Sequence, residues 1–519
     1  MQPIPTTLIR EIQPHQWQAN GEGPHKIAPD DEQALPLVRR LCTALDTETI
    51  RYCHWKSNAA IDRTASGDND LDLLLDRKDC ERFTAIVSAL GFKAAGHEGE
   101  AHLPGVISYY GYERSHGKLI HVHAHYQLVL GHDRTKNYRL PLEDAYLASA
   151  TQQGLFYIPT PEFEFVVFVL RMVLKYSTWD ALLSRQAKLP ASSQRELTYL
   201  LERVQWSEVN RILVDHLPVI SADLFALCTK AIQGRCSLRQ RIKAGRLVQQ
   251  KLQAYTRRAP GEDLFLKGWR RVENGVRRRL GRGVAKARMS GGGAMIAIVG
   301  GDGAGKSTAI SGLSKWIGKE FAVKRLHLGK PRRSLLTKVV RGLVGVIRLP
   351  AKLLRRGRPA QAGATADSTA GFPGYLALVL QLCTARDRYH AYVTGRRFVN
   401  DGGIVICDRF PLRQIKRMDG PQIEELAGAS AGQWFIRRLI KWEKRYYKPI
   451  VEPEALAILR LDPEVAVQRK PEEPAHFVRQ RSAEIWTADW QGSSAHVIDA
   501  GQNKEEVLAE LKSLLWSKL

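Results

Sequence analysis

The chain has 519 residues, of which 44% are hydrophobic and 25% are charged, a composition typical of globular proteins and unlike that of disordered chains. At about 100–200 residues per domain, this length predicts three or four domains. The sequence has no apolar run of about 18 residues, so we expect no transmembrane helix. The first residues lack the basic start and apolar run of a secretory signal. The seven cysteines form no CxxC pair, which favours a reducing compartment over a disulfide framework.

The formal net charge of +25 is concentrated in two segments. Residues 241–290 hold 15 Lys and Arg against three acidic residues, and residues 321–358 hold 12 Lys and Arg with no acidic residue. The rest of the chain is close to neutral. No sequence motif typical of RNA or DNA binding accompanies these segments, so a nucleic-acid partner is not expected.

In the first 256 residues, apolar spacing predicts strands and helices in alternation and then a mostly helical stretch. The predicted elements are a helix at 35–45, a strand at 70–76, a helix at 80–92, strands at 106–113 and 118–130, and helices at 163–176 and 193–204. A loop at 257–263 then leads into the basic segment 269–288, and SGGG at 290–293 is a flexible joint.

Two acidic residues in the N-terminal half have the spacing of a metal-binding pair. Asp70 and Asp72 lie at i and i+2 on a predicted strand, so their carboxylates point to the same side. Together with WKSN at 55–58, this segment resembles an uncharacterised branch of the nucleotidyltransferase superfamily. The resemblance implies that Asp70 and Asp72 hold Mg²⁺ and that Ser57 holds nucleotide phosphates.

Three histidines stand where that superfamily carries its third metal-binding acid. The strand reads His121-Val-His123-Ala-His125, with His123 at the position of the acid, and alternation places all three imidazoles on one face. A transition-metal site, a repurposed active site and plain structural histidines all remain open.

The segment GGDGAGKS at 300–307 fits the phosphate-binding pattern GxxxxGK[ST]. It follows an apolar strand at 295–299 and precedes a helix at 307–317. Glycines in such a loop allow backbone N–H groups to surround phosphate oxygens, the lysine reaches the β- and γ-phosphates, and the following serine ligates Mg²⁺. The predicted nucleotide-binding residues are Gly300, Asp302, Gly303, Gly305, Lys306, Ser307 and Thr308.

The extended string GGDGAGKST resembles the loop of the thymidylate kinase family. Downstream, the two Asp-Arg pairs Asp387-Arg388 and Asp408-Arg409 are spaced as in that family, and 454–470 and 497–511 resemble its later strands and helices. The resemblance implies that Asp408 organises Mg²⁺ and the acceptor phosphate and that Arg409 clamps that phosphate. It further implies that Arg388 contacts the acceptor base and that Asp302 organises the acceptor sugar.

A basic stretch lies where the lid of such a kinase would close. It contains Arg469, Lys470, Arg479 and Arg481. The loop at 300–307 has no arginine of its own, so we expect one or two of these residues, Arg479 and Arg481 first, to meet the transition-state charge.

The segment 324–359 departs from the family pattern. After a short strand, residues 334–356 have an apolar helical face and a basic face formed by Lys338, Arg341, Arg348, Lys352 and Arg355. Two interpretations remain: a helix on an anionic membrane surface, or a helix packed on the kinase domain with its basic face toward solvent or the acceptor.

The sequence thus predicts an α/β multidomain protein. It has a nucleotidyltransferase-like α+β domain at 1–141 with a helical companion at 142–256, a basic linker at 257–293, and a P-loop parallel-sheet kinase domain at 294–519. The expected activity is transfer of a phosphoryl group from ATP, with Mg²⁺, to a nucleoside monophosphate such as dTMP or to a related phosphorylated acceptor. The alternatives are a nucleotidyltransferase of polysaccharide-related metabolism and an ATP-gated adaptor at a membrane surface. The expected location is cytoplasmic, either free or at the inner face of the membrane.

Overall fold

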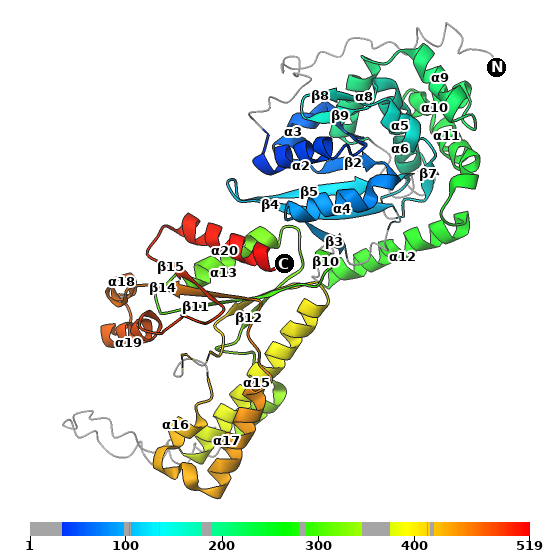
Figure 1. Ribbon diagram of the computed structural model, residues 1–519. Coiled ribbons are helices and arrows are strands. Elements are labelled where there is room, and N and C mark those ends of the chain that lie inside the picture. Colours follow the sequence, from blue (N-terminus) through cyan, green and yellow to red (C-terminus); the bar gives the residue numbers. More distant parts are fainter. Residues whose placement is uncertain are drawn as a thin grey trace. The chain divides into compact units, whose positions relative to one another are not determined.

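The computed structural model describes residues 34–97, 103, 105–133, 135–178, 189–280, 286–344, 374–412, 414–415 and 420–519 (Figure 1). The chain forms two compact units, Met1–Ala285 and Lys286–Leu519. Both contain strands and helices, as the predicted α/β class requires.

The main sheet within unit 1 has the strand order β1-β2-β5-β4-β3. Strands β2 and β5 are parallel, and the other neighbours are antiparallel. The strands are β1 (Tyr52–His54), β2 (Leu71–Leu75), β3 (Lys93–His97), β4 (Val106–Glu113) and β5 (Lys118–His125).

Alternation along β2 and β5 gives this sheet two different faces. On one face, Leu71, Leu73 and Val122 share a core with α2 (Pro36–Thr47) and α4 (Cys80–Ala89). The other face carries the alternate residues, including Asp72 and the three histidines. A short helix, α3 (Ile61–Ala65), precedes β2.

Helices cover part of the second face of the sheet. Trp55 and Leu74 belong to a large core that the helical part also fills, and α6 is buried on nearly all sides. The elements of this part are β6 (Leu128–Leu130), β7 (Tyr138–Leu140), α5 (Glu143–Ala148), β8 (Thr151–Gln153), β9 (Phe156–Ile158), α6 (Pro161–Tyr176), α8 (Ala191–Leu201), α9 (Trp206–His216), α10 (Ala222–Ile232) and α11 (Leu238–Lys251).

Two segments differ from their sequence-based expectation. The strand expected over 118–130 is two strands, β5 and β6, because the partner strand β4 begins only at Val106, which pairs with His125. Most of the segment expected to be a basic linker is the helix α12 (Pro260–Arg279). Its apolar side chains Phe265 and Trp269 are exposed.

Unit 2 is built on a parallel sheet with the order β12-β13-β11-β14-β15. The chain runs from the central strand β11 to one edge and then crosses to the other side, so β11 lies at the point where the strand order reverses. The strands are β11 (Met295–Gly300), β12 (Val323–His327), β13 (Ile404–Asp408), β14 (Ala455–Arg460) and β15 (Ala495–Asp499), and β10 (Ala287–Met289) precedes them.

Helices cover both faces of this sheet. Figure 1 shows α13 and α20 on one face and the start of the long extension built by α15, α16 and α17 on the other. The apolar residues of α15–α17, among them Leu378 and Ile436, form a separate small core. The helices are α13 (Lys306–Ile317), α15 (Tyr375–Asn400), α16 (Ile423–Ala427), α17 (Trp434–Tyr447), α18 (Pro463–Arg469), α19 (Ala475–Trp486) and α20 (Lys504–Lys518).

The structure describes part of the predicted basic amphipathic helix. Residues 335–344 are helical, with Lys338 and Arg341 in them, whereas Arg348, Lys352 and Arg355 lie outside the described residues. Among the helices that the structure describes, none combines the length and the apolar character needed to cross a bilayer.

Candidate functional site

The glycine-rich loop of unit 2 connects the carboxyl end of β11 to the first turn of α13. Gly303 and Gly305 both have φ +79°, a conformation that favours glycine. A Cβ on Gly301 would lie only 2.6 Å from the hydroxyl oxygen of Ser482, so position 301 has no room for a side chain. Ser307 and Thr308 are exposed at the start of α13. The loop therefore presents the N-terminus of a helix, where backbone N–H groups attract anions.

The lysine of the loop points back into it. Lys306 Nζ donates to the carbonyl oxygen of Gly301 at 2.6 Å. Burial lowers the pKa of this ammonium group, and the nearby Arg409 lowers it further. Asp302 and Asp408 act in the opposite direction and raise this pKa.

A carboxylate and a histidine lie at the carboxyl ends of the neighbouring strands. Asp408 ends β13 and pairs with Ile298 of β11, so parallel pairing brings it next to the loop. Its Oδ1 is buried and has no hydrogen-bond partner among the described residues, while Oδ2 is 3.6 Å from His327 Nε2. A buried carboxylate oxygen without a donor is suited to ligating a hard cation, so the residues here fit Mg²⁺.

His327 was not among the residues predicted from the sequence. Its Nδ1 accepts a hydrogen bond from the N–H of Lys330 at 3.1 Å, which leaves the proton of the neutral ring on Nε2, facing Asp408. Burial lowers the pKa of His327, against the raising effect of Asp408. The sequence could have indicated His327 through its place at the end of a strand, because the carboxyl ends of parallel strands lie at the same edge of the sheet.

Asp302 brings two predicted arginines together at the loop. It accepts a hydrogen bond from Arg481 Nη1 at 2.8 Å, and Arg409 Nη2 lies 3.9 Å away. Burial alone would raise the pKa of Asp302, but Arg481, Lys306 and Arg409 hold it below its usual value. Arg409 has φ +65°, a left-handed conformation that is costly for such a residue and is often found at functional sites.

The other basic residues of the predicted lid have partners away from the loop. Arg479 forms two hydrogen bonds with Glu464, Arg469 donates to the carbonyl of Ala500, and Lys470 pairs with Glu473. Arg481, the fourth cation of the predicted lid, is the one that donates a hydrogen bond to Asp302, and Lys470 interacts with Asp302 and Lys306 only through longer-range electrostatics. A transition-state role for Arg479 or Arg481 stays a prediction.

The first Asp-Arg pair fastens the segment that follows β12. Arg388 is buried and donates to the carbonyls of Leu328 at 2.6 Å and Gly329 at 3.1 Å, and also to the hydroxyl of Tyr447. Asp387 accepts from the N–H of Ser334 at 3.1 Å. The pair thus fixes residues 328–334. A contact between Arg388 and an acceptor base stays a prediction.

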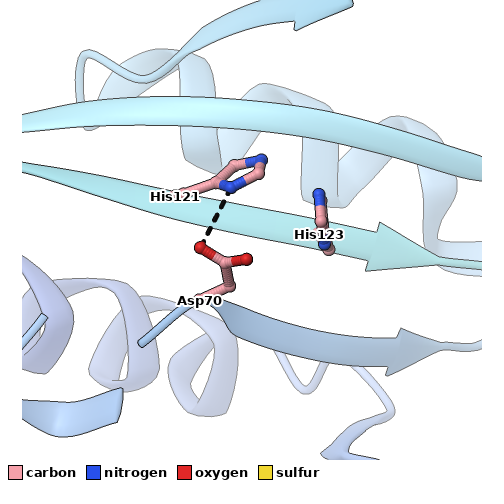
Figure 2. Close-up of side chains that lie close together, drawn as sticks. All are labelled: Asp70, His121 and His123. Atoms are coloured by element: carbon pink, nitrogen blue, oxygen red, sulfur yellow. Dashed lines mark hydrogen bonds and ion pairs between the residues drawn. The ribbon is translucent and has the colours of Figure 1, made fainter. Parts of the chain in front are cut away.

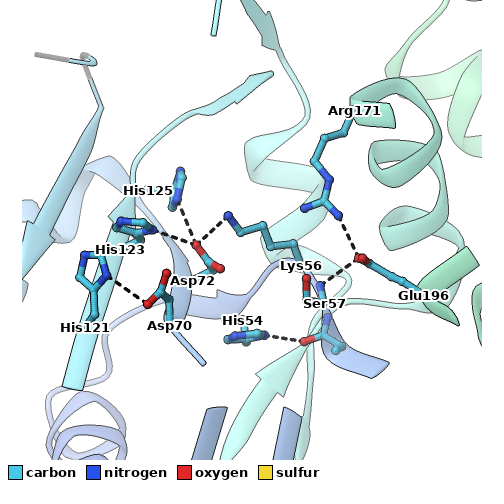
Figure 3. Close-up of polar contacts among 11 residues, drawn as sticks. His54, Lys56, Ser57, Asp70, Asp72, His121, His123, His125, Arg171 and Glu196 are labelled. Carbon is cyan, nitrogen blue, oxygen red and sulfur yellow. Dashed lines mark hydrogen bonds and ion pairs between the residues drawn. The ribbon is translucent and has the colours of Figure 1, made fainter. Parts of the chain in front are cut away.

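In unit 1, acidic residues and histidines gather between β2 and β5. Asp70 Oδ1 lies 3.1 Å from His121 Nδ1 (Figure 2). Asp72 Oδ1 lies 3.2 Å from His123 Nδ1 and 3.6 Å from His125 Nε2 (Figure 3). Parallel pairing places Asp72 directly opposite His123, and all three imidazoles share one face, as the alternation predicts.

Lys56 completes this group, which we call the Asp-His cluster (Lys56, Asp70, Asp72, His121, His123 and His125). Its Nζ lies 2.8 Å from Asp72 Oδ1. Burial would raise the pKa of Asp72, but Lys56 and the histidines hold it well below the usual range. Burial lowers the pKa of His125 to about 3, so this ring is neutral at physiological pH. A role of Asp70 and Asp72 in binding Mg²⁺ stays a prediction.

The backbone amides of the turn predicted to bind phosphate already donate hydrogen bonds to carboxylates. Ser57 has φ +61°, and its N–H donates to Glu196 at 3.1 Å, while the N–H of Asn58 donates to Glu164 at 3.3 Å. Arg171 pairs with Glu196 at 2.9 Å (Figure 3). Burial, followed by repulsion from Glu196, raises the pKa of Glu164 to about 7. No sequence pattern indicated these contacts, and phosphate binding by Ser57 stays a prediction.

No protein-family model matches this chain. It is similar to the uncharacterized ATP-binding protein YghR of Escherichia coli, with 28% identity over 222 residues, which are 42% of this chain and 84% of YghR. It is also similar to the uncharacterized ATP-binding protein YghS of the same organism, with 24% identity over 225 residues, which are 42% of this chain and 92% of YghS.

Replacing Glu164 with glutamine should make the stability of unit 1 less dependent on pH. Because folding raises the Glu164 pKa from 4.5 to about 7, the folded state holds a proton that the unfolded state has released between these values. Wild-type stability is therefore lost as the pH increases through that window. The Glu164→Gln variant is neutral at this position, so it should escape the loss and gain up to roughly 1–3 kcal/mol over the wild type between pH 5 and pH 7.5.

Thermal unfolding from pH 5 to pH 8 would test this expectation. The exposed Glu202, changed to glutamine, is the matched control. If the wild type and the Glu164→Gln variant lose stability in parallel across the window, Glu164 does not titrate as its burial implies.

Proposed function

We propose that unit 2 binds Mg²⁺ and ATP and transfers the terminal phosphoryl group to a phosphorylated small-molecule acceptor, such as a nucleoside monophosphate. One observation carries this proposal: Lys306, Asp408 and Arg409 converge on a glycine-rich loop at the carboxyl edge of a parallel sheet. Ligands of open α/β sheets bind at that edge, where the strand order reverses. The two bacterial relatives are named as ATP-binding proteins, which supports the nucleotide part of the proposal.

Each residue of the loop has a distinct task in this proposal. The N–H groups of residues 301–306 and the ammonium of Lys306 bind the phosphate chain, because both carry positive charge in a partly buried place. Ser307 and the unpartnered oxygen of Asp408 would hold Mg²⁺, which neutralises phosphate charge when bound.

Arg409 is the residue best placed to bind the acceptor phosphate. Its guanidinium lies 3.9 Å from Asp302 of the loop, and its backbone has the left-handed φ of +65°. A guanidinium binds phosphate through two parallel hydrogen bonds. The acceptor side would be bounded by residues 328–334, which Asp387 and Arg388 hold in place.

The geometry also favours attachment to an anionic membrane. In the helix at 335–344, Leu335, Leu336 and Val339 are exposed next to Lys338 and Arg341. Exposed apolar residues beside a purely basic face are typical of interfacial helices. We propose that this helix lies on an anionic lipid surface, where each Lys or Arg contributes about 1 kcal/mol.

Changing Lys306 to alanine should weaken ATP binding by about 10- to 100-fold and abolish turnover, because a charge-assisted contact of roughly 1.5–3 kcal/mol is lost. Isothermal titration with ATP and Mg²⁺ measures the affinity. Lys315→Ala is the matched control, since Lys315 is exposed on the same helix. Equal ATP affinity in the two variants would contradict the proposed phosphate site.

Changing Arg409 to asparagine should reduce use of the acceptor at least tenfold while ATP affinity changes little. Asparagine tolerates the left-handed backbone, so the fold should be unaffected. Labelled ATP with a panel of nucleoside monophosphates and sugar phosphates gives kcat/KM for each acceptor. A loss of ATP affinity as large as the loss of acceptor use would assign Arg409 to the ATP side instead.

Liposome flotation should show binding that increases with anionic lipid and decreases with salt. Changing Lys338 and Arg341 to glutamate should reduce binding at least tenfold, since about 1 kcal/mol is lost per basic residue before repulsion is added. The same change at Arg239 and Lys243 of α11, both exposed and one helical turn apart, is the matched control. Wild-type protein that stays unbound at low salt on strongly anionic vesicles would refute membrane attachment.

A further inference from the structure

Three nitrogen-bearing groups converge on a single oxygen of the Asp-His cluster. Asp72 Oδ1 lies 2.8 Å from Lys56 Nζ, 3.2 Å from His123 Nδ1 and 3.6 Å from His125 Nε2. Metal bonds of about 2.0–2.1 Å place neighbouring ligand atoms roughly 3.0–3.5 Å apart. The spacing between the carboxylate oxygen and the two imidazole nitrogens is therefore close to that of ligands around one ion.

His125 adds a second, independent observation. Its side chain is only 2% exposed, and neither ring nitrogen has a hydrogen-bond partner among the described residues. The ring packs edge-on against Trp55, with centroids 5.0 Å apart, which holds Nε2 toward Asp72. A buried imidazole whose nitrogens make no hydrogen bond is costly, and a metal ion bound at Nε2 would satisfy one of its nitrogens.

The ligand set indicates the class of metal. Two imidazoles and one carboxylate suit Zn²⁺, Co²⁺ or Fe²⁺, whereas Mg²⁺ prefers oxygen ligands alone. Asp70, His121 and His123 form a second group with the same composition, but Asp70 is exposed and His123 is shared between the two groups. The more buried group, Asp72 with His123 and His125, is therefore the stronger candidate. Because His123 belongs to both groups, we expect one metal ion rather than two.

Lys56 bears directly on this site because its ammonium already contacts the oxygen that would bind a metal. It supplies the positive charge that a buried carboxylate requires. A divalent ion at Asp72 would compete with this ammonium for Oδ1 and would be repelled by it.

We propose that Asp72, His123 and His125 bind one transition-metal ion of the Zn²⁺ class, and that this ion displaces Lys56 from Asp72. The proposal is independent of the phosphate loop of unit 2. It predicts two opposite effects within one cluster: loss of a ligand weakens metal binding, whereas loss of the lysine strengthens it.

The test is equilibrium dialysis of the full chain, stripped of metal by a chelator and free of nucleotide, against Zn²⁺, with the bound metal quantified by mass spectrometry. We expect one Zn²⁺ per chain. Asp72→Asn and His125→Gln should weaken binding at least tenfold, and Lys56→Gln should tighten it severalfold. His116→Gln, at an exposed histidine of the same unit, is the matched control and should change nothing.

Two further measurements keep the result interpretable. Co²⁺ bound at the site should give a visible absorption spectrum that Asp72→Asn abolishes and a large excess of Mg²⁺ does not. Because the buried His125→Gln variant can misfold, the tighter binding of Lys56→Gln is decisive, since misfolding would not produce it. Absence of Zn²⁺ binding in the wild type, unchanged affinity in Lys56→Gln, or a larger loss in Asp70→Asn than in Asp72→Asn would overturn the proposal.

Discussion

A carboxylate taken out of water needs a positive partner, and both sites of this chain are organised by that requirement. Burying an isolated charge costs several kcal/mol, so the sheet can place an aspartate beside a buried strand only where a cation balances it. Asp72 has Lys56, and Asp302 has Arg481 with Arg409 nearby. Asp408 has the imidazole of His327 at 3.6 Å and interacts electrostatically with Lys306, but its Oδ1 makes no hydrogen bond among the described residues, which leaves that oxygen for a further cation.

The backbone amides of the two predicted phosphate-binding loops differ between the units. In unit 2, the glycine loop leaves the first N–H groups of α13 facing outward, so this site attracts anions. In unit 1, Glu196 and Glu164 already accept hydrogen bonds from the amides of Ser57 and Asn58, so the amides of the turn that was predicted to bind phosphate have side-chain partners. The site beside it presents carboxylates and imidazoles instead, which attract a cation. This contrast is why a nucleotidyltransferase role for unit 1 gains less support from the geometry than phosphoryl transfer by unit 2.

Much of the unit 2 site could be predicted from the sequence because its signals are local. The glycine pattern, its strand and its helix lie within about 25 residues, and the neighbouring Asp408 stands at the end of an apolar run that is typical of a strand. The alternation of HVHAH likewise predicted three imidazoles on one face. By contrast, His327 becomes a neighbour of Asp408 only through parallel pairing of β12 with β13. Glu164 and Glu196 reach the turn at Ser57 from helices far along the chain, and no local pattern marks such contacts.

Lys56 has a consequence for how unit 1 folds. In small metal domains the metal site does not exist before the chain folds around the ion, so metal binding and folding are one event. Here the ammonium of Lys56 balances Asp72, and the large apolar core around Trp55 and α6 is built from hydrophobic side chains outside the charged cluster. Unit 1 can therefore fold with the cluster metal-free, and an ion that binds must first compete with an internal cation. The affinity for the metal ion therefore depends on how much more favourable Asp72 bound to the ion is than Asp72 paired with Lys56. Such a difference suits reversible metal binding better than a permanent structural role of the ion.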